Sequence, residues 1–206
     1  MLLWASLALF LAGLCAFAVD RRLAHVFREH IVPPWQTYIW RTTDWAKGAF
    51  WLVAALSIYL AAQLLMEFGE QTERLRALSD YALVLLTSVL AASAVLHSTK
   101  FLIGRRRPRD EFQHGFYGFR FLAFSTQHDS FPSGHALTIF CVATVLTAVA
   151  PSFAPLWFAF ASWLALTRAL LTAHYFSDVL FGAALGLITT REMLLLLFPN
   201  LAPAWF

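Results

Sequence analysis

Six apolar stretches alternate with polar segments along the chain, and their lengths set the first expectation about the fold. They cover residues 2–19, 49–66, 81–98, 135–150, 155–171 and 178–198. A helix needs roughly 20 predominantly apolar residues to cross the hydrocarbon core of a bilayer. We therefore predict an all-α integral membrane protein, a six-transmembrane-helix bundle in which residues 1–206 form a single membrane-embedded domain.

Residues 20–48 follow a different pattern, because basic residues and tryptophans interrupt the apolar ones, and Pro33-Pro34 divides the segment. This mixture is typical of helices that lie in the headgroup region. We predict an additional interfacial helical segment here, formed by a pair of helices. Between the fourth and fifth apolar stretches, the short turn Pro151-Ser152-Phe153 predicts a helical hairpin.

The first apolar stretch has two interpretations. Ala16-Phe17-Ala18 resembles a signal-peptide cleavage site, but Met1 to Ser6 contains no Lys or Arg. A secretory signal peptide normally begins with a basic region. We therefore expect residues 1–18 to be retained as the first membrane span.

Composition agrees with a membrane protein: 60% of the residues are hydrophobic and 13% are charged. Soluble domains are about half apolar and about a quarter charged. The net charge of +3 is compatible with headgroup contacts, whereas nucleic-acid binding is not indicated, because the basic residues do not cover a soluble face. Cys15 and Cys141 both lie in apolar stretches, which indicates neither a disulfide framework nor a zinc site.

Three clusters of polar residues lie next to the ends of the apolar stretches. Their members are Lys100 with Arg105-Arg106-Arg107-Pro108, Phe131-Pro132-Ser133-Gly134-His135, and Arg168 with His174 and Asp178. Each crossing of the bilayer changes sides. The end of the third stretch, the start of the fourth, the end of the fifth and the start of the sixth therefore share one face, and the clusters meet there.

This combination suits a phosphate group. Lys100, Arg107 and Arg168 supply positive charge, and arginine presents paired donors to phosphate oxygens. Ser133 and Gly134 begin an apolar helix, where free backbone N–H groups favour an anion. One histidine can attack phosphorus while another protonates the leaving oxygen.

The three clusters resemble the three signature motifs of the type 2 phosphatidic acid phosphatase family, in order and in internal spacing. The matching segments are Lys100-x6-Arg107-Pro108, Pro132-Ser133-Gly134-His135 and Arg168-x5-His174-x3-Asp178. The family often has Ser before the third-motif arginine, where this chain has Thr167, which also carries a hydroxyl.

The resemblance implies a role for each matching residue. His174 is expected to be the nucleophile that forms a phosphohistidine, Asp178 to orient it, and His135 to act as general acid and then to activate water. The phosphoryl oxygens are expected to contact five residues: Lys100, Arg107, Ser133, Gly134 and Arg168. The resemblance implies no metal and no cofactor.

Other polar residues have simpler interpretations. We expect Arg105, Arg106 and Arg109 to anchor a helix end at the headgroups, and Arg191 and Glu192 to pair with each other or with headgroups. The aromatic residues of 112–124 suggest a membrane-surface anchor. Five histidines are expected to be ordinary interfacial residues: His25, His30, His97, His114 and His128. A solvated turn on the opposite face is expected from Glu67, Glu70, Glu73, Arg74, Arg76 and Asp80.

Membrane orientation is indicated in two conflicting ways. Without the three phosphate-binding cations, nine Lys and Arg residues lie on the face with the motifs and three on the other. The positive-inside rule then predicts a cytoplasmic site. Bacterial members of the family usually have it on the outer side of the inner membrane, and we expect that side.

The prediction is a phosphatase of a bacterial-type inner membrane whose partners are a lipid phosphate substrate and the surrounding lipids. Undecaprenyl diphosphate, phosphatidylglycerophosphate, phosphatidate and the phosphates of lipid A remain open as substrate classes, and nothing indicates an oligomeric state. A lipid phosphotransferase with the same site and a non-enzymatic membrane transporter are the alternatives. A vanadium-dependent haloperoxidase has a similar anion site but is soluble.

Overall fold

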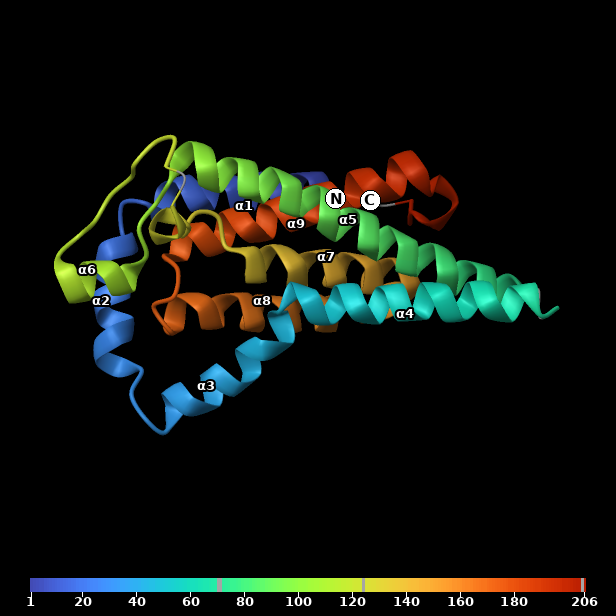
Figure 1. Cartoon of the computed structure of the whole chain (residues 1–206), viewed down its shortest axis with the longest axis horizontal. Coiled ribbons are helices and arrows are strands. Elements are labelled where there is room, and N and C mark those ends of the chain that lie inside the picture. The colour runs from blue at the N-terminus through green and yellow to red at the C-terminus, as the bar shows by residue number, and fades with distance from the viewer. Residues whose placement is uncertain (70–71, 124, 205) are drawn as a thin grey trace.

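The computed structural model describes residues 1–69, 72–123, 125–204 and 206. Within these ranges all the regular elements are helical. The long helices run side by side, while three shorter ones, α2, α3 and α6, gather at one end (Figure 1). The all-α expectation is therefore confirmed.

Each of the six apolar stretches forms one helix of the bundle. These helices are α1 (Leu2–Ala16), α4 (Gly48–Glu67), α5 (Glu73–Ile103), α7 (Gly134–Val149), α8 (Ala154–Leu170) and α9 (Phe176–Leu197). The turn between α7 and α8 is the 3-10 helix η3 (Pro151–Phe153), as the hairpin prediction required, and η4 (Pro199–Leu201) follows α9. α5 extends beyond the predicted stretch at both ends, and Glu73, Arg74, Arg76 and Asp80 belong to its first turns. Glu70 lies outside the described residues.

Length and composition qualify four helical segments as membrane spans: Trp35–Glu67, Glu73–Ile103, Pro151–Leu170 and Phe176–Leu197. α1 qualifies only together with α2, from which it is bent by 84°. α7 has 16 residues and spans about 24 Å at 1.5 Å per residue, less than the ~30 Å hydrocarbon core. The described residues therefore provide four spans, or five if the bent pair is one.

The segment 20–48 forms a helix pair, as predicted: α2 (Asp20–His30) and α3 (Trp35–Thr43), followed by the 3-10 helix η1 (Asp44–Ala46). The pair is interrupted around Pro33-Pro34, because proline lacks the N–H that a continuing helix needs. With α6 (Pro108–His114) and the 3-10 helix η2 (Thr126–His128), these elements make up the polar end of the molecule.

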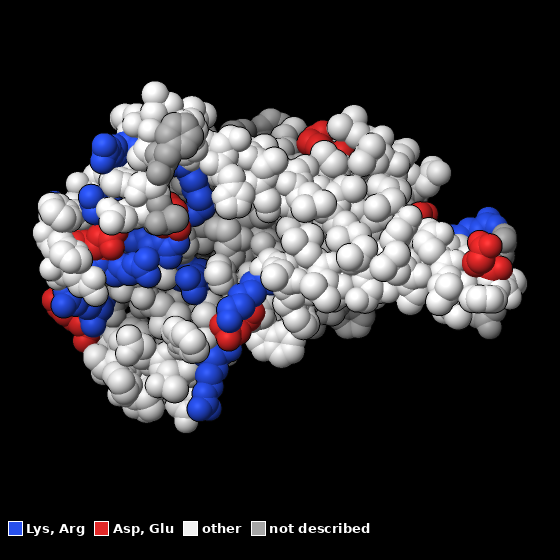
Figure 2. Space-filling view, in the orientation of Figure 1, with Lys and Arg blue, Asp and Glu red and all other residues white. Residues whose placement is uncertain are grey.

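In Figure 2 a wide zone with few charged side chains separates the two ends of the molecule. Lys and Arg gather at the end where α2, α3 and α6 lie, and a small group of both signs marks the α4–α5 turn at the opposite tip. Such a zone is what a bilayer requires, because charges in hydrocarbon are costly.

α7 is the central helix, and twelve of its sixteen residues are buried. Its backbone lies very close to that of α9, because α9 has glycine at the two points of contact. A Cβ at Gly182 would collide with the carbonyl oxygen of Ser133, and a Cβ at Gly186 with that of Leu137. Small residues four apart are typical of close helix contacts in membranes. This contact brings the first turn of α7 against the first turn of α9, where the second and third motifs lie.

Candidate functional site

A cavity of about 290 Å³ at the polar end of the bundle brings the three motifs together. Six of the eight predicted site residues line it: Lys100, Arg107, Gly134, His135, Arg168 and His174. Ser133 and Asp178 do not line it, and both side chains are fully buried behind it. Residues from α4, α5 and α7 complete the wall, including Leu96, His97 and Thr138.

Lys100 and Arg107 reach the cavity from the two sides of a sharp turn. Lys100 lies in the last turn of α5, which ends at Gly104 with a φ of 52°. At this position a Cβ would collide with the carbonyl oxygen of Arg120, so the turn requires glycine. Arg107 then occupies the N-cap position of α6.

Asp129 holds both of these cations. Arg107 donates two hydrogen bonds to its carboxylate, each 2.7 Å long, and the Lys100 ammonium donates to its backbone carbonyl. Although partial burial opposes the charge, the hydrogen bonds and the charge of Arg107 lower the pKa of Asp129 below its usual value. Asp129 therefore stays ionised and sets the direction of the Arg107 guanidinium. The sequence interpretation missed it.

The second motif opens α7. Ser133 is the N-cap residue, its backbone N–H donates to the carbonyl of Asp178 at 2.9 Å, and its buried hydroxyl has no partner among the described residues. Gly134 and His135 form the first helical turn, where backbone N–H groups and the helix dipole favour an anion.

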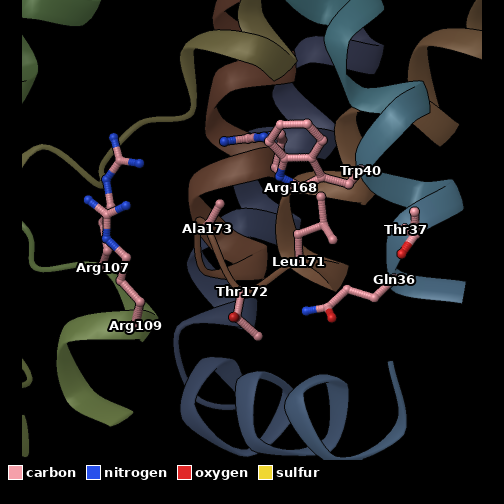
Figure 3. A pocket seen from close by; sticks show the side chains of 9 residues that line it. All are labelled: Gln36, Thr37, Trp40, Arg107, Arg109, Arg168, Leu171, Thr172 and Ala173. Atoms are coloured by element: carbon pink, nitrogen blue, oxygen red, sulfur yellow. The ribbon is translucent and has the colours of Figure 1, made fainter. Parts of the chain in front are cut away.

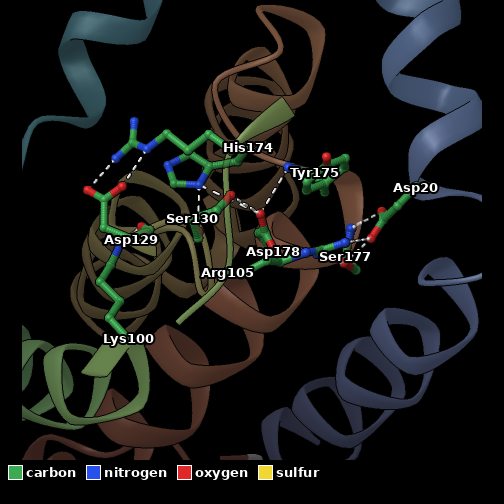
Figure 4. A network of polar contacts seen from close by, with 10 residues as sticks. Asp20, Lys100, Arg105, Asp129, Ser130, His174, Tyr175, Ser177 and Asp178 are labelled. Carbon is green, nitrogen blue, oxygen red and sulfur yellow. Dashed lines mark hydrogen bonds and ion pairs between the residues drawn. The ribbon is translucent and has the colours of Figure 1, made fainter. Parts of the chain in front are cut away.

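His174 lies in the connection before α9, not on the helix. Its Nδ1 lies 2.7 Å from the backbone carbonyl of Ser130 and 3.9 Å from Oδ2 of Asp178. A carbonyl only accepts hydrogen bonds, so Nδ1 carries the proton and Nε2 keeps its lone pair. Ser130, rather than Asp178, is thus the direct partner of the ring (Figure 4).

Asp178 belongs to a buried polar network behind the histidine (Figure 4). It accepts hydrogen bonds from Arg105 at 2.6 Å, from the Ser130 hydroxyl at 2.6 Å and from the Tyr175 backbone at 2.9 Å. Ser130 therefore links the two groups, because its carbonyl holds His174 and its hydroxyl donates to Asp178.

The interpretation of Arg105 as a headgroup anchor is wrong. Its side chain is 0% exposed and bridges two carboxylates, Asp178 at 2.6 Å and Asp20 at 2.8 Å. A guanidinium buried in a low-dielectric interior requires such charged partners, whereas a guanidinium at the headgroups would be solvated by water. Its other hydrogen bond goes to Ser177, which also donates to Asp20 through both its backbone and its hydroxyl. The aromatic faces of Phe17, Phe119 and Tyr175 surround it at 4.1–5.1 Å from the ring centroids.

Arg168 differs from the other arginines around the cavity. One of its terminal nitrogens lies 3.3 Å from the Thr43 hydroxyl, its Nε is buried without a partner among the described residues, and no described carboxylate pairs with it. Its charge is therefore available to an anion in the cavity.

Burial, together with the positive charges of Arg107, Lys100 and Arg168, holds the pKa of His174 well below its usual value. The ring is consequently neutral at physiological pH. A neutral imidazole with a free Nε2, next to three cations, can act as a nucleophile toward an anionic group.

Among the remaining histidines, His128 is buried, which contradicts its interfacial interpretation. His97 is exposed but contributes to the cavity wall, while His25, His30 and His114 are exposed as expected. Arg191 and Glu192 pair with each other, as predicted. The sequence interpretation did not identify Asp20 and Ser130 as members of the site. Asp20 could have been found, because it is a carboxylate directly at the end of an apolar stretch, where an unpaired charge is costly.

Comparisons with known proteins extend over most of the chain. A sequence model described as the PAP2 superfamily matches residues 81–201. The lipid A 1-phosphatase of Rhizobium etli is 33% identical over 102 residues, which are 50% of this chain and 44% of the relative. The lipid A 1-phosphatase of Rhizobium johnstonii is 32% identical over 99 residues, which are 48% of this chain and 41% of the relative. The match thus spans less than half the length of these two relatives.

Two crystal structures share the fold. LpxE of Aquifex aeolicus superposes with a TM-score of 0.58 at 18% identity, covering 85% of this chain and 94% of that one. The PAP2 type phosphatidylglycerolphosphate phosphatase of Bacillus subtilis superposes with a TM-score of 0.60 at 18% identity, covering 98% of each chain. At this identity the likeness establishes the arrangement of helices, not a substrate.

Proposed function

Because the chain belongs to the PAP2 superfamily, we propose that it is a membrane lipid phosphatase that works through a phosphohistidine. The observation that carries the proposal is the shared cavity, in which two imidazoles and three cations converge from distant parts of the chain. The names of the relatives put lipid A first among the candidate substrates, ahead of undecaprenyl diphosphate, phosphatidylglycerophosphate and phosphatidate.

In the proposed first step, Nε2 of His174 attacks phosphorus and the bond to the leaving oxygen breaks. His135 gives a proton to that oxygen, so the lipid departs as an alcohol. In the second step, His135 takes a proton from water, the hydroxide attacks the phosphohistidine, and the P–N bond breaks to release phosphate. Asp178 supports the ring through Ser130 and by its charge 3.9 Å from Nδ1.

Phosphoryl transfer mainly requires stabilisation of charge on the equatorial oxygens. We assign this to Lys100, Arg107 and Arg168 and to the first turn of α7 with Ser133 and Gly134. Arg168, which has no carboxylate partner among the described residues, is the strongest candidate, because an incoming phosphate supplies that partner. These cations perform the role that a metal ion performs in other phosphatases.

The proposal is tested by phosphate release from a panel of the four lipid classes, with purified protein in detergent containing EDTA. Activity should persist in EDTA and vanish in His174→Ala, while His30→Ala remains active, because His30 is exposed and its ring lies against the backbone carbonyl of Val26 on its own helix. Activity that EDTA abolishes, or that survives in His174→Ala, would exclude this mechanism.

The roles of the two histidines are separated by para-nitrophenyl phosphate, whose leaving group needs no protonation. His135→Ala should still form the phosphoenzyme from it, giving a burst of nitrophenol followed by slow hydrolysis, whereas His174→Ala should give no burst. If His135→Ala also gives none, the assignment of the nucleophile and the acid is wrong.

We further propose that α1, α4, α5, α7, α8 and α9 each cross the bilayer, with the cavity at the periplasmic surface. The burial of Arg105 removes one residue from the basic face and leaves eight of nine, so the conflict with the positive-inside rule is reduced, not removed.

In a Cys15→Ala background, Gln113→Cys should react with an impermeant maleimide in intact cells, and Phe68→Cys only after permeabilisation. The reverse pattern would place the site in the cytoplasm.

A further inference from the structure

A second cavity, of about 500 Å³, lies directly beside the one that contains the histidines. Its wall includes three arginines and three residues of α3: Arg107, Arg109, Arg168, Gln36, Thr37 and Trp40. Arg107 and Arg168 belong to both cavities. A group held between these two arginines therefore has direct access to the second cavity.

The wall of the second cavity is suited to binding, not to chemistry. It contains three arginines and no histidine or carboxylate. Arg109 is 60% exposed, and its nearest carboxylate is that of its neighbour Asp110 at 3.8 Å, which is a weak pairing. Arg168 has no carboxylate partner among the described residues. Positive charge of this kind favours an anionic ligand.

Neutral hydrogen-bonding groups form the other side of the wall. Gln36 and Thr37 lie four and three residues before Trp40 on α3, so each lies beside Trp40 on the surface of this helix. Figure 3 shows them opposite Arg107 and Arg109, with the connection Leu171–Ala173 between the two sides. An amide and hydroxyls match a hydroxylated ligand, and the exposed indole offers a flat apolar face to the C–H groups of a sugar ring.

The size of the cavity also argues for more than a phosphate ion. Pockets of about 300–1,000 Å³ accommodate ligands of drug-like size. A path for departing phosphate alone needs neither this volume nor an indole. Moreover, α3 lies outside residues 81–201, which the superfamily model matches, so the side of the wall formed by Gln36, Thr37 and Trp40 is not part of the three motifs.

We propose that the second cavity is a headgroup subsite, which binds a sugar carrying a second anionic group, next to the phosphate under attack. Trp40 and Gln36 contact the sugar, and Arg109 pairs with the second anion. This inference rests on the proposed function, since it places the scissile phosphate between Arg107 and Arg168. The class of substrate is a phosphorylated glycolipid, rather than a glycerol or polyprenyl phosphate.

The test compares two substrates that share the scissile phosphate but differ in the headgroup. Bisphosphorylated lipid A should reach both cavities, whereas phosphatidate has no headgroup beyond its phosphate. Trp40→Ala should lower kcat/KM for lipid A by about tenfold or more, mainly through KM, and should leave phosphatidate within about twofold. Trp35→Ala is the matched control, because Trp35 is a similarly exposed tryptophan of α3 that does not line the cavity.

Arg109 tests the second anion separately. Arg109→Ala should weaken hydrolysis of bisphosphorylated lipid A by a similar factor, and should not affect the same lipid without its second phosphate. An equal loss on both lipids would overturn the assignment of Arg109. If Trp40→Ala affects lipid A and phosphatidate equally, or affects neither, the cavity is not a headgroup subsite.

A binding measurement keeps this inference distinct from the proposed reaction. In inactive His174→Ala, lipid A in micelles should bind more tightly than phosphatidate, and the added Trp40→Ala should remove the difference. If the wild type hydrolyses neither lipid but this difference is present, the subsite is supported and the reaction is not. If lipid A has no advantage in binding, the inference fails whatever the activity.

Discussion

Arg105 donates a hydrogen bond of 2.6 Å to Asp178, 73 residues further along the chain, and neither side chain is exposed to solvent. The same guanidinium reaches Asp20, at the start of α2. One cation thus connects α2 to the carboxylate that lies behind His174. Asp178 contributes to a second contact, because its Oδ2 accepts the hydroxyl of Ser130.

Replacement of Arg105 by methionine should destabilise the protein strongly. It leaves Asp20 and Asp178 buried without their cation, and removal of one partner from a buried ion pair costs about 3–5 kcal/mol. Unfolding in detergent, followed by circular dichroism, measures the loss. Arg106→Met serves as the control, since Arg106 is only half-buried and lies over the ring of Phe116. Equal stability of the two variants would show that the network contributes little.

His174 should remain neutral well below pH 6.5, because its pKa is lowered in the folded protein. The unfolded chain takes up a proton near pH 6.5 and the folded chain does not, so the free energy of unfolding should fall as the pH decreases through that range. The ring can be followed by NMR of protein labelled at histidine and assigned by loss of its signal in His174→Asn. Protonation of His174 at or above pH 6.5 would contradict the buried, cation-surrounded environment.

Asp129→Asn should impair catalysis more than stability. The carboxylate directs Arg107 through two hydrogen bonds, and the amide can replace only one acceptor. Because Asp129 is partly exposed, we expect at most about 1 kcal/mol of destabilisation, together with about a tenfold loss of kcat/KM. Asp110→Asn is the control, since Asp110 contacts Arg109 only at 3.8 Å. A variant with normal kcat/KM would mean that Arg107 is positioned without Asp129.

Gly186→Ala should destabilise the bundle, although alanine is the better helix former by about 1 kcal/mol. A Cβ at this position would meet the carbonyl oxygen of Leu137 on α7, and overpacking of this kind costs about 1–3 kcal/mol. Thr189→Ala on the same helix, at a half-buried position, should have a smaller effect. Resistance to thermal unfolding in detergent distinguishes the two. A more stable Gly186→Ala would show that the helices can separate without loss.

The activity of Gly186→Ala should fall together with its stability. The α7–α9 contact keeps Ser133 hydrogen-bonded to Asp178 across the first turns of both helices, so a shift of one helix moves the second motif relative to the third. The same lipid assay in detergent, performed well below the unfolding temperature, separates this displacement from unfolding.

The six bundle helices and the convergence of the motifs could be predicted from the sequence alone. Apolar length predicts helices in a bilayer, and a change of side at each predicted crossing is expected to bring Lys100, Gly134 and Arg168 to one face. Both arguments depend on local composition and on the order of elements, which are properties that the sequence carries directly. The cavity that contains His135 and His174 accordingly agrees with what the spacing implied.

Which groups contact one another, by contrast, depends on how distant parts of the chain pack together. Arg105 follows Gly104 in a run of three arginines, and nothing local distinguishes it from Arg106, yet one is fully buried and the other is not. Its partner Asp20 lies 85 residues away, so the pairing depends on how α2 packs against the bundle. The partner of His174 is the backbone carbonyl of Ser130, and every residue has such a carbonyl, so no pattern of side chains could have indicated it. The type of a side chain limits which groups it can bind, whereas the packing of distant elements determines which of those groups it contacts.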